Sequence, residues 1–393
     1  QARPRPLPAP VTIATRPCAN GLQRISTFTL GTSTIFTFLL INHVHSVTAF
    51  SKEHLPLHKP FDTPRFRPRR NGAQVPPRRR PPRARPADRM PEGHTLHRLA
   101  GSLNGAFAGT VPTLSSPQGR FADGAAYLSG RELHEAAAWG KHLFVEFAGE
   151  AHLHVHLGLI GAFDVTAYSA RGGDDEGYAA GSPGGALPPP VGAVRLRIAT
   201  GTHVADLRGA TVCEVATTQE VDAVIARLGP DPLRADADPD RAWRRIVKSP
   251  RSIADLLMDQ AVLAGVGNVY RSEILFRHRV DPWRPGRDIR PVTWRTLWRD
   301  LLLLMPIGVQ LGQIITMRDQ VETVLAGDFD PAAVPTSPTG VSAWRPNPHG
   351  ALERRYYVYK RQGEPCRVCG SRVRMAEVAG RNLYWCGRCQ RRR

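Results

Sequence analysis

The sequence predicts an α+β protein, in which a β-sandwich with flanking helices is followed by a helical region and a short cysteine-rich hairpin. Between residues 111 and 207, short alternating apolar runs are punctuated by Gly and Asp, which is typical of an antiparallel sandwich or barrel. From residue 221 onward, apolar residues recur at helical spacing. Four of the six cysteines lie between residues 366 and 389.

The expected elements follow in order along the chain. Leu96, Leu99 and Leu103 share one helical face within 95–103. Strands are expected at 111–114, 131–136, 142–147, 152–156, 162–166, 194–199 and 203–207, with a further strand at 356–359. Helices are expected at 221–228, 240–248, 253–264, 270–276, 293–305 and 307–326. The Gly- and Pro-rich stretch 169–190 is expected to be a surface loop.

The first 89 residues differ in composition from the rest of the 393-residue chain. They hold 14 of the 35 prolines, and 14 Arg and 2 Lys against 3 acidic residues, which is +13 of the net charge of +19. Such a segment buries too little apolar surface to offset its ordering entropy, so 1–89 is expected to be a disordered basic extension. We favour an upstream extension with the true start at Met90. The alternative is a basic tail that adds nonspecific DNA affinity.

The remaining charge and the apolar pattern restrict the class of protein. Residues 90–393 keep a net charge of +6, and a basic balance favours a nucleic-acid partner. No apolar stretch approaches the ~20 residues of a membrane helix. Residues 1–50 lack a clean secretory signal as well. We therefore expect no membrane association and a cytoplasmic location.

The cysteine spacing indicates a metal site. Cys366-x2-Cys369 and Cys386-x2-Cys389 are separated by sixteen residues, which matches a tetrahedral four-thiolate zinc site in a reducing compartment. Four protein ligands leave no open coordination position, so one structural Zn²⁺ is expected. Many Arg residues surround the cysteines, and a rigid hairpin carrying Arg can grip phosphate. Any single one of them can equally be a solvated surface charge.

Two weaker motifs gain weight beside the cysteines. The Gly-rich turn in 263–271 lies between two expected helices, where backbone amides form a phosphate cradle and Asn268 adds a side-chain donor. Met90 precedes Pro91, Glu92, Gly93 and His94. If Met90 is the initiator and is removed, Pro91 becomes an N-terminal secondary amine that can attack a sugar C1′ as Lys does in Schiff-base enzymes. Glu92 can then shuttle protons. Taken alone, this segment is better interpreted as an ordinary turn.

Together these motifs resemble the formamidopyrimidine-DNA glycosylase and endonuclease VIII family over residues 90–393. Five elements occur in the family's order: the Pro-Glu-Gly start at 91–93, Gly-Lys-His at 140–142, His-Leu-Gly-Leu-Ile-Gly at 156–161, the 259–268 segment, and the cysteine hairpin. The start and Leu159 are similar to an endonuclease VIII-type member of the actinobacterial kind. The resemblance implies a catalytic β-sandwich domain at 90–218, a helical domain with a helix–two-turns–helix element at 219–350, and a zinc-finger β-hairpin at 351–393.

The resemblance also implies residue roles. The nucleophile falls on Pro91, the acid/base carboxylate on Glu92 and the hairpin lysine near the lesion on Lys141. The phosphate-binding residues fall on Asn268 and Arg381.

Two further positions would fill the gap left by the flipped nucleotide. They fall on Leu159 and Arg208. Core packing for Leu159 and a surface charge for Arg208 remain open alternatives. The chain departs from the family at Ala210, where an aromatic wedge is usual, and at Thr95, where a second acidic residue is common. Both departures put the choice of lesion in doubt.

The resemblance implies a bifunctional DNA glycosylase and abasic-site lyase of base excision repair. It would remove oxidised bases, preferably pyrimidines, through an N-terminal proline Schiff base and cleave the strand by β,δ-elimination. The expected partner is damaged double-stranded DNA, the protein a bacterial monomer, and no redox or nucleotide cofactor is expected. While 1–89 stays attached, Pro91 is an internal amide and the lyase should be inactive. The main alternative is a non-catalytic nucleic-acid-binding protein. A nuclease ranks low, because no carboxylate cluster for two metal ions is evident.

Overall fold

The computed structural model describes residues 25–30, 34–39, 91–168, 187–327 and 352–391. The chain forms two compact units, one within 1–79 and one within 80–393. In the first unit, β1 (Ile25–Leu30) pairs antiparallel with β2 (Thr34–Leu39), where disorder was expected. Thr, Ile and Phe dominate both strands, and these residue types favour a pleated strand. The rest of the predicted extension lies outside the described residues.

The second unit begins with two antiparallel four-stranded sheets. One sheet has the order β10–β6–β5–β4, and the other has the order β3–β8–β9–β7. The strands are β3 (Thr113–Ser115), β4 (Leu133–Trp139), β5 (His142–Phe147), β6 (Ala151–His156), β7 (Ala162–Ala167), β8 (Val194–Ala199), β9 (His203–Arg208) and β10 (Val212–Thr217). Strand β10 and helix α2 (Ala122–Leu128) were not anticipated from the sequence.

One apolar core joins the two sheets and helix α1 (Gly93–Phe107). Leu103 of α1, Leu143 of β5 and Leu196 of β8 are all completely buried in it. Burial of side chains from both sheets on one core is the defining feature of a sandwich. The predicted sandwich with a flanking helix is therefore confirmed, and the alternative of a barrel is not.

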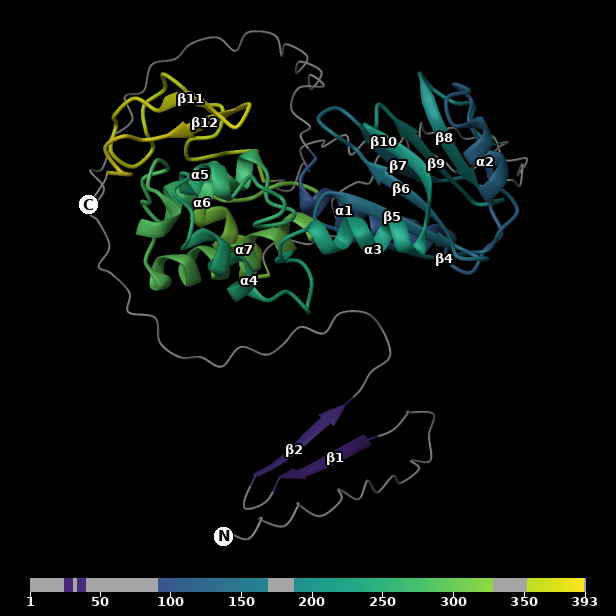
Figure 1. Ribbon diagram of the computed structural model, residues 1–393, viewed down its shortest axis with the longest axis horizontal. Coiled ribbons are helices and arrows are strands. Elements are labelled where there is room, and N and C mark those ends of the chain that lie inside the picture. The colour runs from purple at the N-terminus through teal and green to yellow at the C-terminus, as the bar shows by residue number, and fades with distance from the viewer. Residues whose placement is uncertain (1–24, 31–33, 40–90, 169–186, 328–351, 392–393) are drawn as a thin grey trace, which may run out of the picture. The chain divides into compact units, whose positions relative to one another are not determined.

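The second half of this unit is helical. Its helices are α3 (Thr218–Arg227), α4 (Pro239–Ile246), α5 (Ile253–Leu256), α6 (Asn268–Arg277), α7 (Pro291–Leu311) and α8 (Arg318–Leu325). Tyr270 of α6 and Leu301 of α7 are fully buried in its core. The hairpin of β11 (Arg374–Val378) and β12 (Arg381–Trp385) adds Leu383 to the same core and lies over α5 and α6 (Figure 1).

The predicted helix 253–264 is shorter than expected. Only Ile253–Leu256 is helical, and turns follow as far as Gly267. Gln260 explains the difference, because its side-chain amide bonds to the backbone of Met258, Gly265 and Val266 and replaces helical hydrogen bonds.

The break between two expected helices lies further along the chain than predicted, and one expected strand is a turn. Helix α7 continues through Pro306, ends at the left-handed Gly312 and is followed by the separate α8. Residues 356–359 form no strand, because the buried carboxylate of Glu273 accepts the N–H groups of Tyr357, Val358 and Tyr359 at 2.8–2.9 Å.

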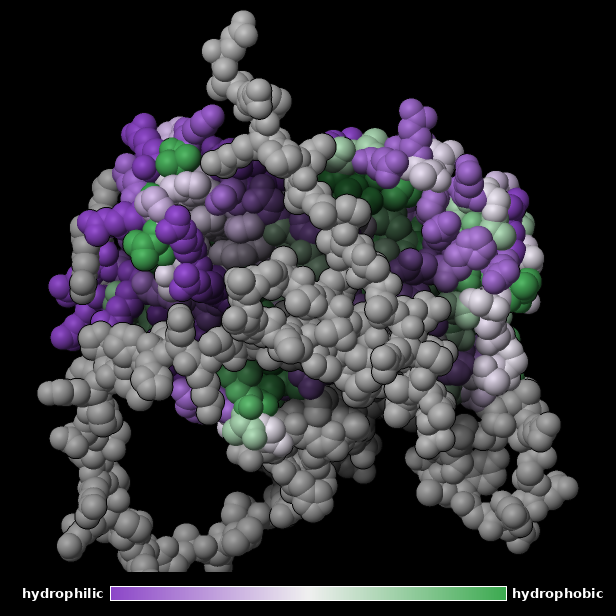
Figure 2. All heavy atoms as spheres, turned by 90° about the horizontal axis from the view of Figure 1, so that it is seen from below, coloured by the Kyte–Doolittle hydropathy of each residue, from purple (hydrophilic) through white to green (hydrophobic). Residues whose placement is uncertain are grey.

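The distribution of hydrophobic residues on the surface bears on which partners the protein can bind. Figure 2 shows one face, on which green hydrophobic residues occur in separate groups among purple hydrophilic ones. Among the described residues, no helix combines the length and apolar character that crossing a membrane requires.

Candidate active site

Glu92 lies at the junction of the two halves of the second unit. Its carboxylate is 1% exposed and accepts the backbone N–H of Gly267 at 2.9 Å and of Val269 at 2.7 Å. These N–H groups belong to the first turn of α6, where the helix dipole favours an anion. The sequence predicted this turn as a phosphate cradle, and in the structure the amides of Gly267 and Val269 hold a carboxylate.

Close glycine packing allows this contact. A Cβ atom on Gly267 would lie 2.4 Å from Cδ of Glu92, and one on Gly93 would lie 2.7 Å from Cα of Gly265. Gly93 also donates its N–H to the carbonyl of Gly265 at 2.8 Å. The Pro-Glu-Gly segment and the Gly-rich turn therefore pack directly against each other, and half-buried Pro91 lies one residue from the seated carboxylate.

Lys141 follows the turn between β4 and β5 and is half-buried. Burial lowers its pKa to about 8, while Glu92 opposes this shift and the guanidinium groups of Arg381 and Arg271 add to it. Burial likewise raises the pKa of Glu92, against the lowering effects of Lys141 and of the α6 amides. A carboxyl group and an amine whose pKa values both move toward neutrality are suited to proton transfer near pH 7.

The residues predicted to bind phosphate lie where α6 meets the hairpin. Asn268 is 6% exposed, donates to the carbonyl of Asn382 at 2.9 Å and accepts from Arg271. Arg381 at the start of β12 is half-buried, and its guanidinium donates to the carbonyl of Gly380 at 3.0 Å. Glu92 raises and Arg381 lowers the pKa values of both Lys141 and Arg271, so these two cations lie within electrostatic reach of both groups.

The two wedge candidates differ in how free their side chains are. Leu159, in the loop between β6 and β7, is 46% exposed, which excludes the alternative that it packs in the core. Its neighbour Ile160 is 77% exposed. Gly161 keeps the loop tight, because a Cβ there would lie 2.2 Å from the carbonyl oxygen of Leu157.

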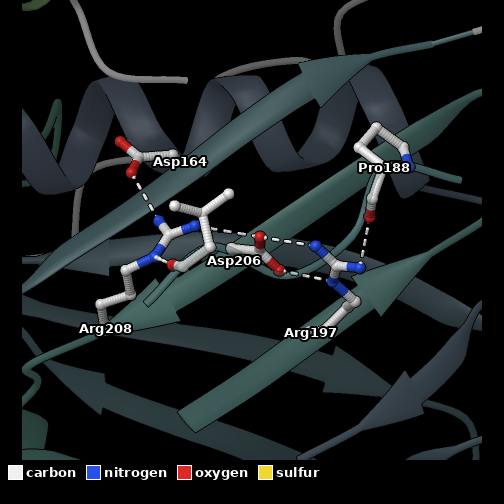
Figure 3. Close-up of polar contacts among 6 residues, drawn as sticks. Asp164, Pro188, Arg197, Asp206 and Arg208 are labelled. Carbon is white, nitrogen blue, oxygen red and sulfur yellow. Dashed lines mark hydrogen bonds and ion pairs between the residues drawn. The ribbon is translucent and has the colours of Figure 1, made fainter. Parts of the chain in front are cut away.

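Arg208, in contrast, is fully engaged within the sheet (Figure 3). Its guanidinium pairs with Asp164 at 2.9 Å and with Asp206 at 3.0 Å, and its Nε donates to the carbonyl of Val191 at 2.8 Å. Asp206 also pairs in bidentate fashion with buried Arg197. The side chain is still 27% exposed, so the part of Arg208 that reaches solvent is held in place by two carboxylates.

The four clustered cysteines are brought together as the spacing predicts. Their sulfur atoms all lie within 4.8 Å of one another, with Cys369 and Cys386 at 3.4 Å and Cys366 and Cys389 at 3.9 Å. A tetrahedron with Zn–S bonds of about 2.3 Å has sulfur separations of roughly 3.8 Å. The site therefore fits zinc, and four thiolates would complete the coordination of one ion.

The site includes residues that sequence reasoning missed. Asp231 lies 3% exposed beneath the Lys141 turn, and its only sequence signal is a position between two prolines. A histidine chain on β5 and β6 was also missed, although His152, His154 and His156 alternate along one expected strand. His154 bonds to Glu214 through Nδ1 and to His142 through Nε2, each at 2.9 Å.

Comparison with known proteins identifies the family. The formamidopyrimidine-DNA glycosylase N-terminal domain matches residues 90–212, the H2TH domain of that glycosylase matches 228–320, and a zinc finger found in FPG and IleRS matches 363–392. "Endonuclease 8 1" of Mycobacterium tuberculosis is 49% identical over 301 residues, which is 77% of this chain and all of the relative. The chain belongs to the formamidopyrimidine-DNA glycosylase and endonuclease VIII family.

Two further proteins show how far the similarity extends. "Probable endonuclease 8 2" of Streptomyces coelicolor is 30% identical over 77% of this chain and 94% of its own length. A Lactococcus lactis Fpg, solved in complex with abasic-site DNA, has a TM-score of 0.58 at 19% identity and covers 77% of this chain and all of that one. That similarity concerns the fold alone. Membership of the family makes this protein a DNA glycosylase and abasic-site lyase of base excision repair, which binds damaged DNA and carries a zinc-finger site.

Proposed function

We propose that this glycosylase removes oxidised bases, preferably pyrimidines, from duplex DNA by using the amine of Pro91 as its nucleophile. The observation that carries the proposal is the buried Glu92 carboxylate on the first turn of α6, one residue from Pro91 and within electrostatic reach of Lys141. The preference for oxidised pyrimidines rests on similarity to endonuclease VIII-type relatives.

The chemistry assigns a role to each group. The Pro91 nitrogen attacks C1′ of a flipped nucleotide, the glycosidic bond breaks, and the base leaves with a proton. Opening of the sugar ring gives an iminium between Pro91 and C1′. Loss of a C2′ proton then breaks the C3′–O bond, and a second elimination breaks the C5′–O bond. Glu92, whose pKa burial raises, is the proposed proton carrier for these steps.

The remaining residues bind and shape the DNA. Asn268 and Arg381 contact the phosphates around the flipped nucleotide, and Leu159 enters the space that the nucleotide leaves. Arg208 is proposed to reach the same space through the exposed part of a guanidinium that its two aspartates hold in place. One zinc ion holds the β11–β12 hairpin rigid and takes no part in the chemistry. We propose that the enzyme acts as a monomer in the bacterial cytoplasm.

The state of the N-terminus decides whether the lyase is active. With Met90 attached, the Pro91 nitrogen is an amide and cannot form an iminium. The nucleophile therefore requires a chain that begins at Pro91. If residues 1–90 are retained, the protein still offers the zinc hairpin and α6 to DNA, and the alternative of a non-catalytic DNA-binding protein applies to that form.

Borohydride trapping tests the proposal. The full chain and residues 90–393 are each incubated with sodium borohydride and a labelled duplex that contains an abasic site. We expect a covalent adduct at residue 91 for the short form alone. Pro91→Gly, which keeps a primary amine, should retain part of the trapping, and Glu92→Gln should lose it. Tight DNA binding without any adduct from the processed short form would refute the lyase mechanism.

A further inference from the structure

The turn that carries Lys141 is held from the helical half by one short loop, residues 230–234. Asp231 in this loop is 3% exposed. Its Oδ2 accepts the backbone N–H of Gly140 at 2.7 Å and lies 2.8 Å from Nε2 of His97 on α1. Its Oδ1 accepts the N–H of Leu233 at 2.9 Å. A single carboxylate thus joins the β4–β5 turn, helix α1 and its own loop.

A second contact from the same loop holds the residue that precedes Gly140. The guanidinium carbon of Arg234 lies 3.4 Å from the ring centroid of Trp139, the last residue of β4. Arg234 in turn donates its backbone N–H to the carbonyl of Asp231 at 3.0 Å. The loop therefore fixes two consecutive residues, Trp139 and Gly140, directly before Lys141.

The turn also has little room to move. Gly140 has a φ of +61°, and a Cβ there would lie 2.9 Å from Cβ of Ala264. The adjoining Gly265 accepts the N–H of Gly93, next to Glu92. The distance between the β4–β5 turn and the Gly-rich segment 263–267 therefore sets the separation between Lys141 and Glu92.

We infer that Asp231 is a positioning residue, which fixes the Trp139–Lys141 turn so that the Lys141 amine faces Glu92 and the reacting sugar. The inference rests on the proposed function of Lys141. Asp231 acts through the hydrogen bond to Gly140 and does not itself reach the reacting atoms. A carboxylate suits this task because it offers two acceptor oxygens, whereas an amide offers only one.

The test uses Asp231→Asn in the 90–393 form, which corresponds to the full length of the mycobacterial relative. Its amide oxygen can accept from Gly140 or from Leu233, but not from both groups with the same geometry. Asp222→Asn is the matched control, because Asp222 is exposed on helix α3 and lies outside the 230–234 loop. His97→Gln removes one contact of Asp231 and leaves the Gly140 bond in place.

Two measurements are made on each variant. The first is the pH dependence of Lys141 acetylation by trace acetic anhydride, followed by mass spectrometry, which does not depend on any activity. The second is single-turnover cleavage of abasic-site DNA at saturating enzyme. For Asp231→Asn we expect the labelling midpoint of Lys141 to rise toward that of an ordinary lysine and the cleavage rate to fall about tenfold to a hundredfold. Asp222→Asn should match the parent, and His97→Gln should lie between them.

An unchanged labelling midpoint in folded Asp231→Asn would overturn the inference. If that variant does not fold, Gly140→Ala displaces the same turn while keeping Asp231, and it must shift the Lys141 midpoint in the same direction for the inference to stand. Failure of the proposed function has a different signature. In that case the parent itself shows no cleavage, while Lys141 labelling still responds to Asp231→Asn.

Discussion

The carboxylate of Glu92 accepts the backbone N–H of Val269 at 2.7 Å, although 177 residues separate the two in sequence. Through this bond the start of the catalytic domain forms the cap of α6, which itself lacks a side-chain cap from Gly267. The same carboxylate that we propose for proton transfer therefore also joins the two halves of the enzyme. If the proposal holds, proton transfer and assembly of the active site depend on one side chain.

Replacement of Gly267 by Ala tests the contact between the Glu92 carboxylate and the amides of α6. The new Cβ would lie 2.4 Å from Cδ of Glu92, so the carboxylate must leave the amides of α6. We expect loss of borohydride trapping and a loss of stability of about 1–3 kcal/mol from the unpaired buried groups, measured by urea unfolding. Gly101→Ala is the control, because nothing lies within 4 Å of its Cβ in helix α1, and it should stabilise by about 0.5–1 kcal/mol. Equal trapping and equal stability of the two variants would argue against binding of Glu92 by the amides of α6.

The depressed pKa of Lys141 predicts a pH-dependent effect on stability. Burial lowers this pKa to about 8 in the folded state, against 10.5 for an ordinary lysine. Between these values the unfolded chain binds more protons, so the stability of the parent should rise with pH across this window. Lys141→Met lacks this contribution. The variant should be more stable than the parent at pH 7 by a margin that shrinks above pH 8, measured by urea unfolding, while its DNA cleavage is impaired. A stability difference between variant and parent that stays constant with pH would contradict the lowered pKa of Lys141.

The histidine chain predicts fixed tautomers. The Glu214 carboxylate only accepts, so His154 carries its proton on Nδ1 and offers Nε2 as the acceptor for Nδ1–H of His142. Burial is the main cause that lowers the pKa of His142 to about 3. Nitrogen-15 NMR should therefore show His142 neutral between pH 5 and 8, with its proton on Nδ1 when His154 is neutral too. Glu214→Gln should change the tautomer signal of His154. Titration of His142 in that range would contradict this assignment.

Removal of the metal should act on DNA binding through the hairpin. Cys386→Ser takes away a ligand that is completely buried, and the hairpin that carries Arg381 and contacts Asn268 should loosen. We expect the zinc content, measured by plasma mass spectrometry, to fall from about one ion per chain. Duplex affinity at fixed salt should weaken about tenfold or more. Cys213→Ala is the control for loss of a buried thiol outside the cluster. Retained affinity in a zinc-free Cys386→Ser would show that the hairpin does not need the ion.

Local patterns were enough for most of the fold. The apolar patterns at 142–147 and 203–207 placed β5 and β9 within a residue of their observed ends. The pattern failed where a distant side chain took over the backbone hydrogen bonds. Glu273 captures the amides of 357–359 and prevents a strand, and Gln260 ends the helix expected up to residue 264. Neither side chain carries a local signal of this role.

The sequence by itself determined the order of the sandwich, the helices and the hairpin, because periodic burial and the CxxC spacing are local properties. It also nominated Pro91, Glu92, Lys141 and the four zinc ligands, because these lie in short motifs. Only the tertiary structure decided that the Glu92 carboxylate binds the first amides of α6. It also decided that Leu159 is exposed while Arg208 is held by two aspartates. The contact of Asp231 with the Lys141 turn was likewise decided by the tertiary structure alone. Each of these contacts joins segments far apart in sequence, and the packing of the two halves decides which groups meet.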